Sequence, residues 1–256
     1  MDPRFAGIER LYGAGCVARL GRAHVCVVGL GGVGSWAVEA LARSGVGELT
    51  LIDADDVCVS NVNRQSHALE GEYGRPKVDV VAQRMRAINP RIRVHALTEF
   101  VTLGNLETLL DRGYDAVIDA CDALRIKVEM IAFCKRRKIP IVVSGSAGGR
   151  TDPSLITARD LTRTEHDILL GLVRRRLRDE RGWTRNPKRY FGVQAVFSRE
   201  NVRYLQADGS VCGERPADSE GSLKLDCGGG LGAAMHVTAT FGFVAVARVI
   251  ERLLAA

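Results

Sequence analysis

Short apolar runs alternate with amphipathic stretches along the first half of the chain. Runs of strand length occupy residues 24–28, 48–52, 92–97, 116–119 and 139–144. Between them, apolar residues recur at helical spacing in residues 35–44, 76–88, 103–112 and 124–137. Such alternation is typical of parallel strands joined by right-handed helical crossovers. We therefore expect an α/β fold with a Rossmann-like, doubly wound and mostly parallel sheet, which binds ligands at the carboxyl ends of its strands.

The alternation fades after residue 149. Weaker patterns predict, in order, a basic helix, a hairpin strand and polar loops at residues 164–181, 193–204 and 206–225. Residues 231–254 are rich in Ala, Val, Phe and Leu, but polar and charged residues interrupt them, which favours a packed helix over a membrane span. We interpret residues 1–256 as a single domain, with an alternating core at residues 22–149 and an irregular C-terminal extension at residues 150–256.

The composition adds two expectations. The formal net charge is +6, and residues 159–189 hold nine arginines and one lysine against five acids, a local net charge of +5. Polyanions are therefore natural partners for this segment, although a solvated basic helix face explains the same charges. The seven cysteines include no C-x-x-C pair, and the first residues show no secretory pattern. We accordingly expect reduced thiols, a cytoplasmic location and no structural zinc.

A glycine-rich turn joins the first predicted strand to the helix that follows it. Its glycines are Gly29, Gly31, Gly32 and Gly34. Small residues there allow backbone N–H groups and the helix N-terminus to approach phosphates closely. Asp53 lies 19 residues after Gly34, at the end of the second predicted strand, where its carboxylate can hold a pair of ribose hydroxyls. These features alone fit an NAD site as well as an ATP site.

Two cations help to separate these ligands. Arg64 stands in the stretch S-N-V-N-R-Q at residues 60–65, and Lys77 stands in G-R-P-K-V at residues 74–78. An enzyme that displaces pyrophosphate must neutralise charge that builds up on the β and γ phosphates, whereas hydride transfer needs only a diphosphate cradle. Arg64 and Lys77 suit the first role, although both residue types are also common on protein surfaces.

These motifs resemble those of the ubiquitin-activating superfamily, which includes the bacterial adenylyltransferases of molybdopterin and thiamine synthesis. The patterns G-x-G-G-x-G, D-x-D-x-V-x-x-S-N-x-x-R-Q, G-x-x-K and D-A-C-D occur in the order of the family between Gly29 and Asp122. The resemblance implies an adenylyltransferase that uses ATP and has its nucleotide-binding core at residues 22–149. It also implies that Gly31 and Asp53 hold the adenosine part, with Asp55 beside them in the nucleotide site.

The same resemblance assigns roles at the phosphates. Four residues would bind them: Asn61, Asn63, Arg64 and Lys77. Arg64 and Lys77 would also be catalytic, because they stabilise negative charge as pyrophosphate leaves. Asp122 would coordinate Mg²⁺ or orient the α-phosphate, since a hard dication beside phosphate oxygens fits one carboxylate plus water. Family members more often place Asn after this aspartate, whereas Ala123 follows it here.

Over its length the chain is similar to one branch of the superfamily, the tRNA threonylcarbamoyladenosine dehydratases. The stretches that carry this similarity are residues 10–13, 55–59, 63–65, 145–149, 225–227 and 238–246. The similarity implies that ATP adenylates the threonyl carboxylate of N6-threonylcarbamoyladenosine in tRNA. The neighbouring carbamoyl group then closes a ring, so that AMP and pyrophosphate are released and the nucleoside loses one water.

Three other functions stay open at this point. A sulfur-carrier adenylyltransferase shares the nucleotide motifs, but typically has two C-x-x-C pairs that this chain lacks. An NAD-dependent oxidoreductase shares the glycine-rich turn, but needs a hydride-orienting residue that the sequence does not reveal. A non-enzymatic tRNA-binding scaffold would retain the nucleotide without turnover.

The resemblance also concerns residues outside the nucleotide motifs. Arg174, Arg175 and Arg176 would bind the tRNA phosphate backbone. The enzyme would form a homodimer in which Arg10 reaches the partner's nucleotide site, although a surface position on a leading helix explains Arg10 as well. Cys227 would take up the activated carboxyl as a thioester, unless it is a small buried cysteine at a turn. The family also suggests a cysteine desulfurase system as partner, and a bound monovalent cation stays open.

Overall fold

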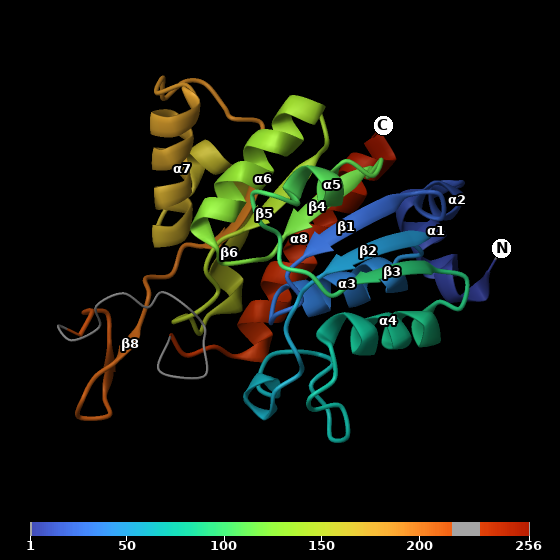
Figure 1. The fold of residues 1–256 in the computed structure, drawn as a ribbon, viewed down its shortest axis with the longest axis horizontal. Coiled ribbons are helices and arrows are strands. Elements are labelled where there is room, and N and C mark those ends of the chain that lie inside the picture. The colour runs from blue at the N-terminus through green and yellow to red at the C-terminus, as the bar shows by residue number, and fades with distance from the viewer. Residues whose placement is uncertain (1, 217–230, 256) are drawn as a thin grey trace.

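The structure is a computed structural model that describes residues 2–216 and 231–255 of the chain. Seven strands form one sheet in the order β3-β2-β1-β4-β5-β7-β6 (Figure 1). The strands are β1 (His24–Val28), β2 (Glu48–Ile52), β3 (Arg93–Leu97), β4 (Ala116–Asp119), β5 (Ile141–Ser144), β6 (Ile156–Asp160) and β7 (Gln194–Ser198). All neighbours in the sheet are parallel except β6 and β7, which are antiparallel. The predicted fold class is confirmed.

Helices cover both faces of the sheet. Those on one face are α3 (Gly34–Arg43), α4 (Lys77–Ile88) and α8 (Met235–Ala255). Those on the other face are α5 (Leu106–Leu110), α6 (Leu124–Arg137) and α7 (Ile168–Arg181). The chain crosses from the first face to the second between β1 and β4, which is the position at which doubly wound sheets bind their ligands.

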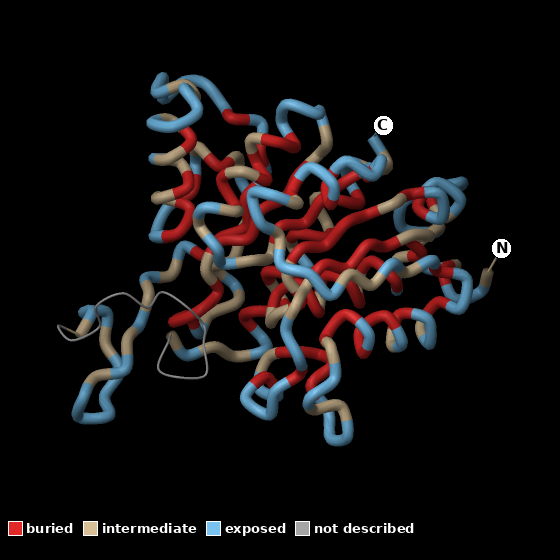
Figure 2. Tube along the Cα trace, viewed as in Figure 1, coloured by how far each residue is buried: buried red, intermediate tan, exposed pale blue. Residues whose placement is uncertain are grey.

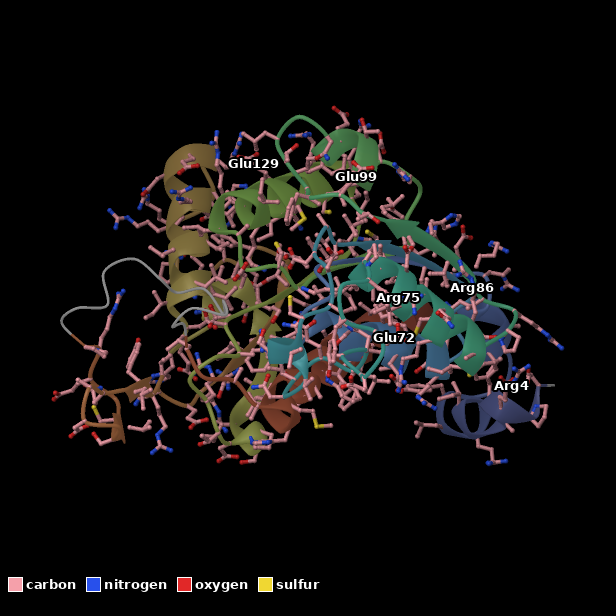
Figure 3. All side chains as sticks on the ribbon, turned by 60° about the horizontal axis from the view of Figure 1, so that its bottom comes forward. Arg4, Glu72, Arg75, Arg86, Glu99 and Glu129 are labelled. Carbon is pink, nitrogen blue, oxygen red and sulfur yellow. The ribbon has the colours of Figure 1, made fainter. Side chains whose placement is uncertain are left out.

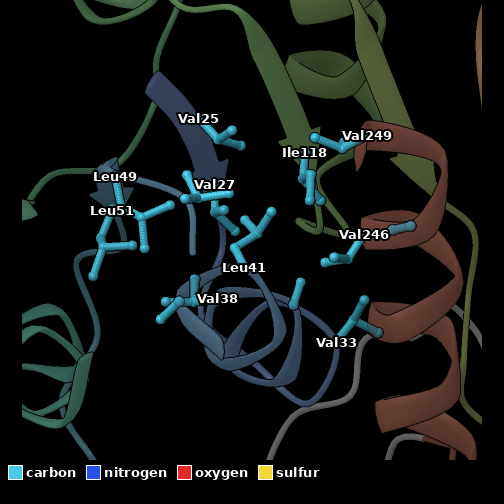
Figure 4. Packing of buried hydrophobic residues seen from close by; sticks show 14 of the residues in the cluster. Val25, Val27, Val33, Val38, Leu41, Leu49, Leu51, Ile118, Val246 and Val249 are labelled. Atoms are coloured by element: carbon cyan, nitrogen blue, oxygen red, sulfur yellow. The ribbon is translucent and has the colours of Figure 1, made fainter. Parts of the chain in front are cut away.

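The central strands β1, β2, β4, β5 and β7 are largely buried, and Figure 2 shows buried chain at the centre of the molecule, whereas the edge strands β3 and β6 are partly exposed. Successive side chains of a strand point to opposite faces, so each central strand contributes to two cores. Val25 and Val27 pack with residues of α3 and α8 in one core (Figure 4). Cys26 and Val28 pack with residues of α5 and α6 in the other. Continuous apolar runs, rather than alternating ones, are the expected pattern for such strands.

Hydrogen bonds from backbone amides to two side chains explain why two helices start away from the predicted positions. Asn105 accepts a hydrogen bond from the Thr102 amide at 2.7 Å, so residues 102–105 form a turn and α5 begins only at Leu106. Asp167 accepts one from the Leu170 amide at 2.8 Å and caps α7, which begins at Ile168 rather than at residue 164.

The C-terminal extension contributes to the same sheet. The predicted hairpin strand is β7, which pairs with β5 and with β6, a strand that the sequence pattern did not reveal. The stretch that was expected to form only polar loops contains β9 (Val211–Cys212), which pairs with β8 (Tyr204–Leu205). That expectation is therefore wrong for its first residues, and its last ones lie outside the described residues. The helix predicted near the C-terminus is confirmed as α8, which packs on α3 and on the sheet.

Among the described residues, no helix is both long and apolar enough to span a membrane. The apolar face of α8 is instead buried within the protein, where Phe241, Ala245 and Val249 are almost inaccessible to solvent. This packing explains the high apolar content of the segment.

Two short helices precede the sheet, α1 (Ala6–Tyr12) and α2 (Cys16–Leu20). The Gly47 amide donates to the Leu20 carbonyl at 3.0 Å, and Gly47 directly precedes β2. Both helices therefore lie at the amino ends of the strands, opposite the arrowheads in Figure 1.

Candidate active site

The glycine-rich turn connects the carboxyl end of β1 to α3. Gly29 has φ +87°, and a Cβ atom on it would lie 3.0 Å from the backbone of Ala120 and Cys121. A Cβ on Gly34 would lie 1.8 Å from the Gly29 carbonyl oxygen, which excludes any side chain there. These two glycines allow the turn to pack against the segment after β4, so the ends of β1 and β4 form one surface.

Gly31 differs from its neighbours. A Cβ on Gly32 would lie 3.1 Å from Arg64 Cγ and from Thr238 Cβ, whereas a Cβ on Gly31 would meet no protein atom within 4 Å. The protein interior therefore gives no steric reason for glycine at position 31, and the space above it is open. Among the described residues, the amides of residues 31–34 donate no hydrogen bond to the protein. An open backbone at a helix N-terminus fits a phosphate group.

Asp53 stands at the end of β2 beside this turn. Its carboxylate accepts the Leu30 amide at 2.6 Å and the Asp55 amide at 2.9 Å. Burial raises the pKa of Asp53, although Lys77 and these amide bonds work against that shift. Asp53 thus shapes the glycine-rich turn itself, and each of its oxygens keeps lone-pair capacity for a ribose hydroxyl.

The two predicted phosphate-binding cations occupy different environments. Lys77 begins α4, and its buried Nζ lies 2.8 Å from the exposed Asp55 carboxylate. Arg64 donates to the Ser60 carbonyl at 2.9 Å and to the Asn63 side chain at 3.0 Å. Among the described residues no carboxylate pairs with Arg64, so its charge is available to an anion beside Gly32. Arg75, close to Lys77 in sequence, is instead paired with Glu72 (Figure 3).

Asn61 and Asn63 have structural partners. The buried Asn61 accepts the Cys58 amide at 3.1 Å and closes the 3₁₀ turn Val59–Asn61. Asn63 donates to the Ala233 carbonyl at 2.7 Å, just before α8 begins. Both asparagines therefore fix the loop that carries Arg64, and their predicted contact with phosphates stays a prediction.

Asp122 lies in the segment between β4 and α6, next to the glycine-rich turn. It is exposed, and among the described residues it forms no ion pair or hydrogen bond. Such a carboxylate meets the requirement of one protein ligand for a hydrated Mg²⁺ on phosphates.

A buried ion pair holds this segment in place. Lys127 Nζ lies 2.8 Å from Asp119 Oδ2, and both side chains are fully buried. The second oxygen of Asp119 accepts the Cys121 amide at 3.2 Å and the Cys121 thiol at 3.1 Å. Sequence reasoning did not assign a role to this pair. The sequence feature that could have revealed the pair is a lysine on the apolar face of a helix. Lys127 shares one buried face of α6 with Ile131 and Cys134.

The remaining predicted residues lie away from this surface or outside the described residues. Arg10 is exposed on α1, at the amino ends of the strands. β1 has five residues and is therefore roughly 16 Å long, and Arg10 and the glycine-rich turn lie at its opposite ends. The structure therefore does not bring Arg10 into the nucleotide site of its own chain. Cys227 lies outside the described residues.

The basic helix α7 presents its charges in paired form. Arg174 is half-buried and donates to the Thr164 hydroxyl, and burial lowers its pKa. Arg175 and Arg176 form ion pairs with Asp179 and Glu180, one turn further along the helix, at 3.6 Å each. Such exposed pairs contribute little to stability and exchange easily, so they leave Arg175 and Arg176 free to contact an anion.

The fold and this geometry are those of a nucleotide-binding α/β protein, with an open helix N-terminus and Arg64 where the two faces of the sheet meet. The chain matches the ThiF family over residues 6–250 and belongs to that family. It is similar to tRNA threonylcarbamoyladenosine dehydratase of Escherichia coli (strain K12), with 50% identity over 252 residues that cover 98% of this chain and 94% of the relative.

Two solved structures of the E. coli tRNA N6-threonylcarbamoyladenosine dehydratase, TcdA, extend this similarity to three dimensions. One is a complex with ATP, with a TM-score of 0.86 and 45% sequence identity. The other is a complex with AMP, with a TM-score of 0.86 and 46% identity. Each match covers 98% of this chain and 94% of the solved chain. The predicted superfamily and its dehydratase branch are confirmed.

Proposed function

We propose that this chain is an ATP-dependent dehydratase that acts on N6-threonylcarbamoyladenosine in tRNA and releases AMP and pyrophosphate. The observation that carries the proposal is the open backbone at Gly31, beside the α3 N-terminus and the uncompensated Arg64. Similarity to dehydratases over nearly the whole chain supports the substrate, and relatives bound to ATP and to AMP support the two nucleotide states. The NAD-dependent and sulfur-carrier alternatives have no comparable support.

In the first step, a carboxylate oxygen of the threonyl group attacks the α-phosphorus of ATP. The bond between the α-phosphorus and the bridging oxygen breaks, so that an acyl-adenylate and pyrophosphate form. Arg64 and Lys77 stabilise the charge that develops on the departing phosphates. When ATP binds, Lys77 exchanges its contact with the exposed Asp55 for a contact with a phosphate. The buried ammonium then has a negatively charged partner both with and without ATP.

In the second step, the carbamoyl group of the same nucleoside attacks the acyl carbon. AMP leaves with the former carboxylate oxygen, a proton is lost, and a ring closes. Because nucleophile and acyl carbon belong to one molecule, positioning of the acyl-adenylate supplies much of the acceleration. This step needs no covalent bond to the enzyme, so the proposal gives Cys227 no required catalytic role.

Mg²⁺ would be held by Asp122 together with the phosphates, where it would neutralise part of the triphosphate charge. The exposure of Asp122 and its lack of a partner among the described residues support that assignment. Asp119 and Lys127 fix the backbone that carries Asp122. A monovalent cation and a cysteine desulfurase partner stay predictions from the family resemblance.

The proposal includes a two-fold dimer in which Arg10 completes the nucleotide site of the partner. Its position at the amino ends of the strands supports action in trans, because the same chain cannot bring it to the carboxyl ends. The exposed Leu11 and Tyr12 beside Arg10 provide apolar surface of the kind that interfaces bury. The tRNA would follow the basic helix α7, chiefly through Arg175 and Arg176.

The decisive experiment is mass spectrometry of nucleosides from tRNA that carries N6-threonylcarbamoyladenosine, after incubation with the enzyme and ATP. We expect a product that is lighter by one water, with equal amounts of AMP and pyrophosphate. Release of ADP and phosphate, or an unchanged nucleoside in the presence of active nucleotide turnover, would refute the proposal.

A further inference from the structure

A cluster of two histidines and one glutamate lies at the opposite end of the sheet from the nucleotide site. His24 opens β1, Glu48 opens β2, and His95 lies in β3. The strand register pairs His24 with Glu48 and pairs Thr50 with His95. Because side chains alternate between faces, Glu48 and Thr50 share one face of the sheet, and their cross-strand partners share it too.

The potential ligand atoms of the cluster converge. His95 Nε2 lies 2.8 Å from Glu48 Oε1, and His24 Nδ1 lies 3.8 Å from the same oxygen. One ligand atom from each of the three residues lies within 4.8 Å of the others. Ligands at about 2.1 Å from a tetrahedral metal lie roughly 3.4 Å from one another, so the two distances bracket the required value. Small side-chain rotations are sufficient to form the site.

His24 is already oriented for this role by a neighbour. Its other ring nitrogen, Nε2, lies 2.9 Å from the Thr50 hydroxyl. A metal-binding histidine usually donates its second N–H to such an oxygen, which fixes the tautomer and the ring orientation. When Nε2 carries the proton and donates it to the Thr50 hydroxyl, Nδ1 is the unprotonated nitrogen, and it faces Glu48 Oε1. The side chains of His24 and Glu48 are mostly buried, whereas His95 is half-exposed and keeps the site open to solvent.

We propose that His24, Glu48 and His95 bind a divalent transition metal of the zinc type, which links the amino ends of β1, β2 and β3. Two imidazole nitrogens and one carboxylate oxygen favour Zn²⁺, Co²⁺ or Ni²⁺ over Mg²⁺ and Ca²⁺, which prefer oxygen ligands. Water completes the coordination on the exposed side. The absence of C-x-x-C pairs does not bear on this site, because it uses no cysteine.

Arg93 opposes the metal and provides the sharpest test. Its guanidinium contacts Glu48 Oε2, the oxygen that faces away from the histidines. A positive charge on the same carboxylate repels a dication, but Arg93 is two-thirds exposed and can turn into solvent. Replacing Arg93 should therefore tighten metal binding about three- to tenfold. A cluster without a metal function would show no such gain.

The experiment is zinc titration of the full-length protein against a chromophoric chelator, after removal of metals and with the thiols kept reduced. The seven cysteines provide background sites, so the readout is the difference between variants. Wild type should bind one equivalent more than His95→Ala and one more than Glu48→Gln, and Arg93→Gln should keep this equivalent with higher affinity. Zinc should raise the melting temperature of wild type, and raise it less in the first two variants.

His166→Asn is the matched control, because it removes an exposed histidine elsewhere and asparagine tolerates the positive φ of that position. It should bind zinc as wild type does. Equal stoichiometry in wild type, His95→Ala and Glu48→Gln would overturn the proposal, and so would weaker binding by Arg93→Gln. A metal-free melting temperature close to that of wild type shows that a variant is folded. Turnover with Mg-ATP should persist in His95→Ala, since the cluster lies at the other end of the strands.

Discussion

Replacement of Lys127 by methionine tests the ion pair beneath the Asp122 segment. Lys127 Nζ and Asp119 Oδ2 are 2.8 Å apart, and neither side chain reaches solvent. Burial opposes the charged ammonium and is the largest single effect on its pKa. The charge and hydrogen bond of Asp119, together with Cys121 and Asp167, outweigh burial and raise the pKa of Lys127. Lys127→Met leaves the Asp119 carboxylate buried without its cation. Removing one partner of a buried pair costs about 3–5 kcal/mol, a large part of the stability of a typical domain.

The double variant Asp119→Asn with Lys127→Met separates charge from packing. It keeps nearly the same volume and an acceptor for the Cys121 amide, but it buries no net charge. We expect it to recover most of the lost free energy, because uncharged replacements of buried pairs are often neutral in stability. Single Lys127→Met should also lower kcat, since the displaced backbone carries Asp122.

Urea unfolding of wild type, both single variants and the double variant gives the coupling free energy of the pair. We expect a coupling of about 2 kcal/mol or more, because the residues are in direct contact. Two results would refute the reasoning. One is a cost below about 1 kcal/mol for Lys127→Met, and the other is a double variant whose loss equals the sum of the single losses.

Four further predictions concern the proposed reaction. Arg64→Ala and Lys77→Ala should each lower kcat/KM, measured by pyrophosphate release, about 10²- to 10³-fold. The melting temperature of Arg64→Ala should stay within a few degrees of wild type, and full activity of either variant would show that its residue has no part in the mechanism. Arg10→Ala and Lys77→Ala subunits, inactive separately, should recover up to about a quarter of wild-type activity after random exchange, whereas no recovery after verified exchange would contradict action in trans. Replacing the arginines at residues 174–176 by Gln should flatten the salt dependence of tRNA affinity without changing ATP affinity, and an unchanged slope would return them to an ordinary solvated face. Cys227→Ser should keep most of the cyclisation activity, so an inactive but folded variant would restore the thioester hypothesis.

The sequence predicted the strands of the central sheet well because each is a short apolar run between helical patterns. It predicted the glycine-rich turn because Gly29 and Gly34 must be glycine for steric reasons that act over a few residues. It did not reveal β6, which ends in the charged residues Arg159 and Asp160 and acquires its conformation by pairing with β7. Pairing between distant segments leaves little trace in a local pattern.

The site was predicted less completely than the fold. Asn61 and Asn63 were assigned to phosphates from the family pattern. In the structure Asn61 accepts the Cys58 amide, and Asn63 donates to the Ala233 carbonyl, 170 residues away, while its oxygen accepts from Arg64. Lys127 was treated as part of an amphipathic helix, and its buried partner became evident only in three dimensions. Such contacts depend on how elements pack, which neither spacing nor residue type determines.

The packing of α8 against the glycine-rich turn has a consequence for the order in which the protein matures. A Cβ on Gly242 would lie 2.6 Å from the Val33 carbonyl oxygen, and Thr238 lies against Gly32. Helix α8 therefore forms one wall of a turn that lies about 200 residues earlier in the sequence. During synthesis the strands and helices of the first half emerge without that wall. The nascent chain is therefore expected to acquire nucleotide affinity only after α8 has been released and has docked, since contacts this distant in sequence form late.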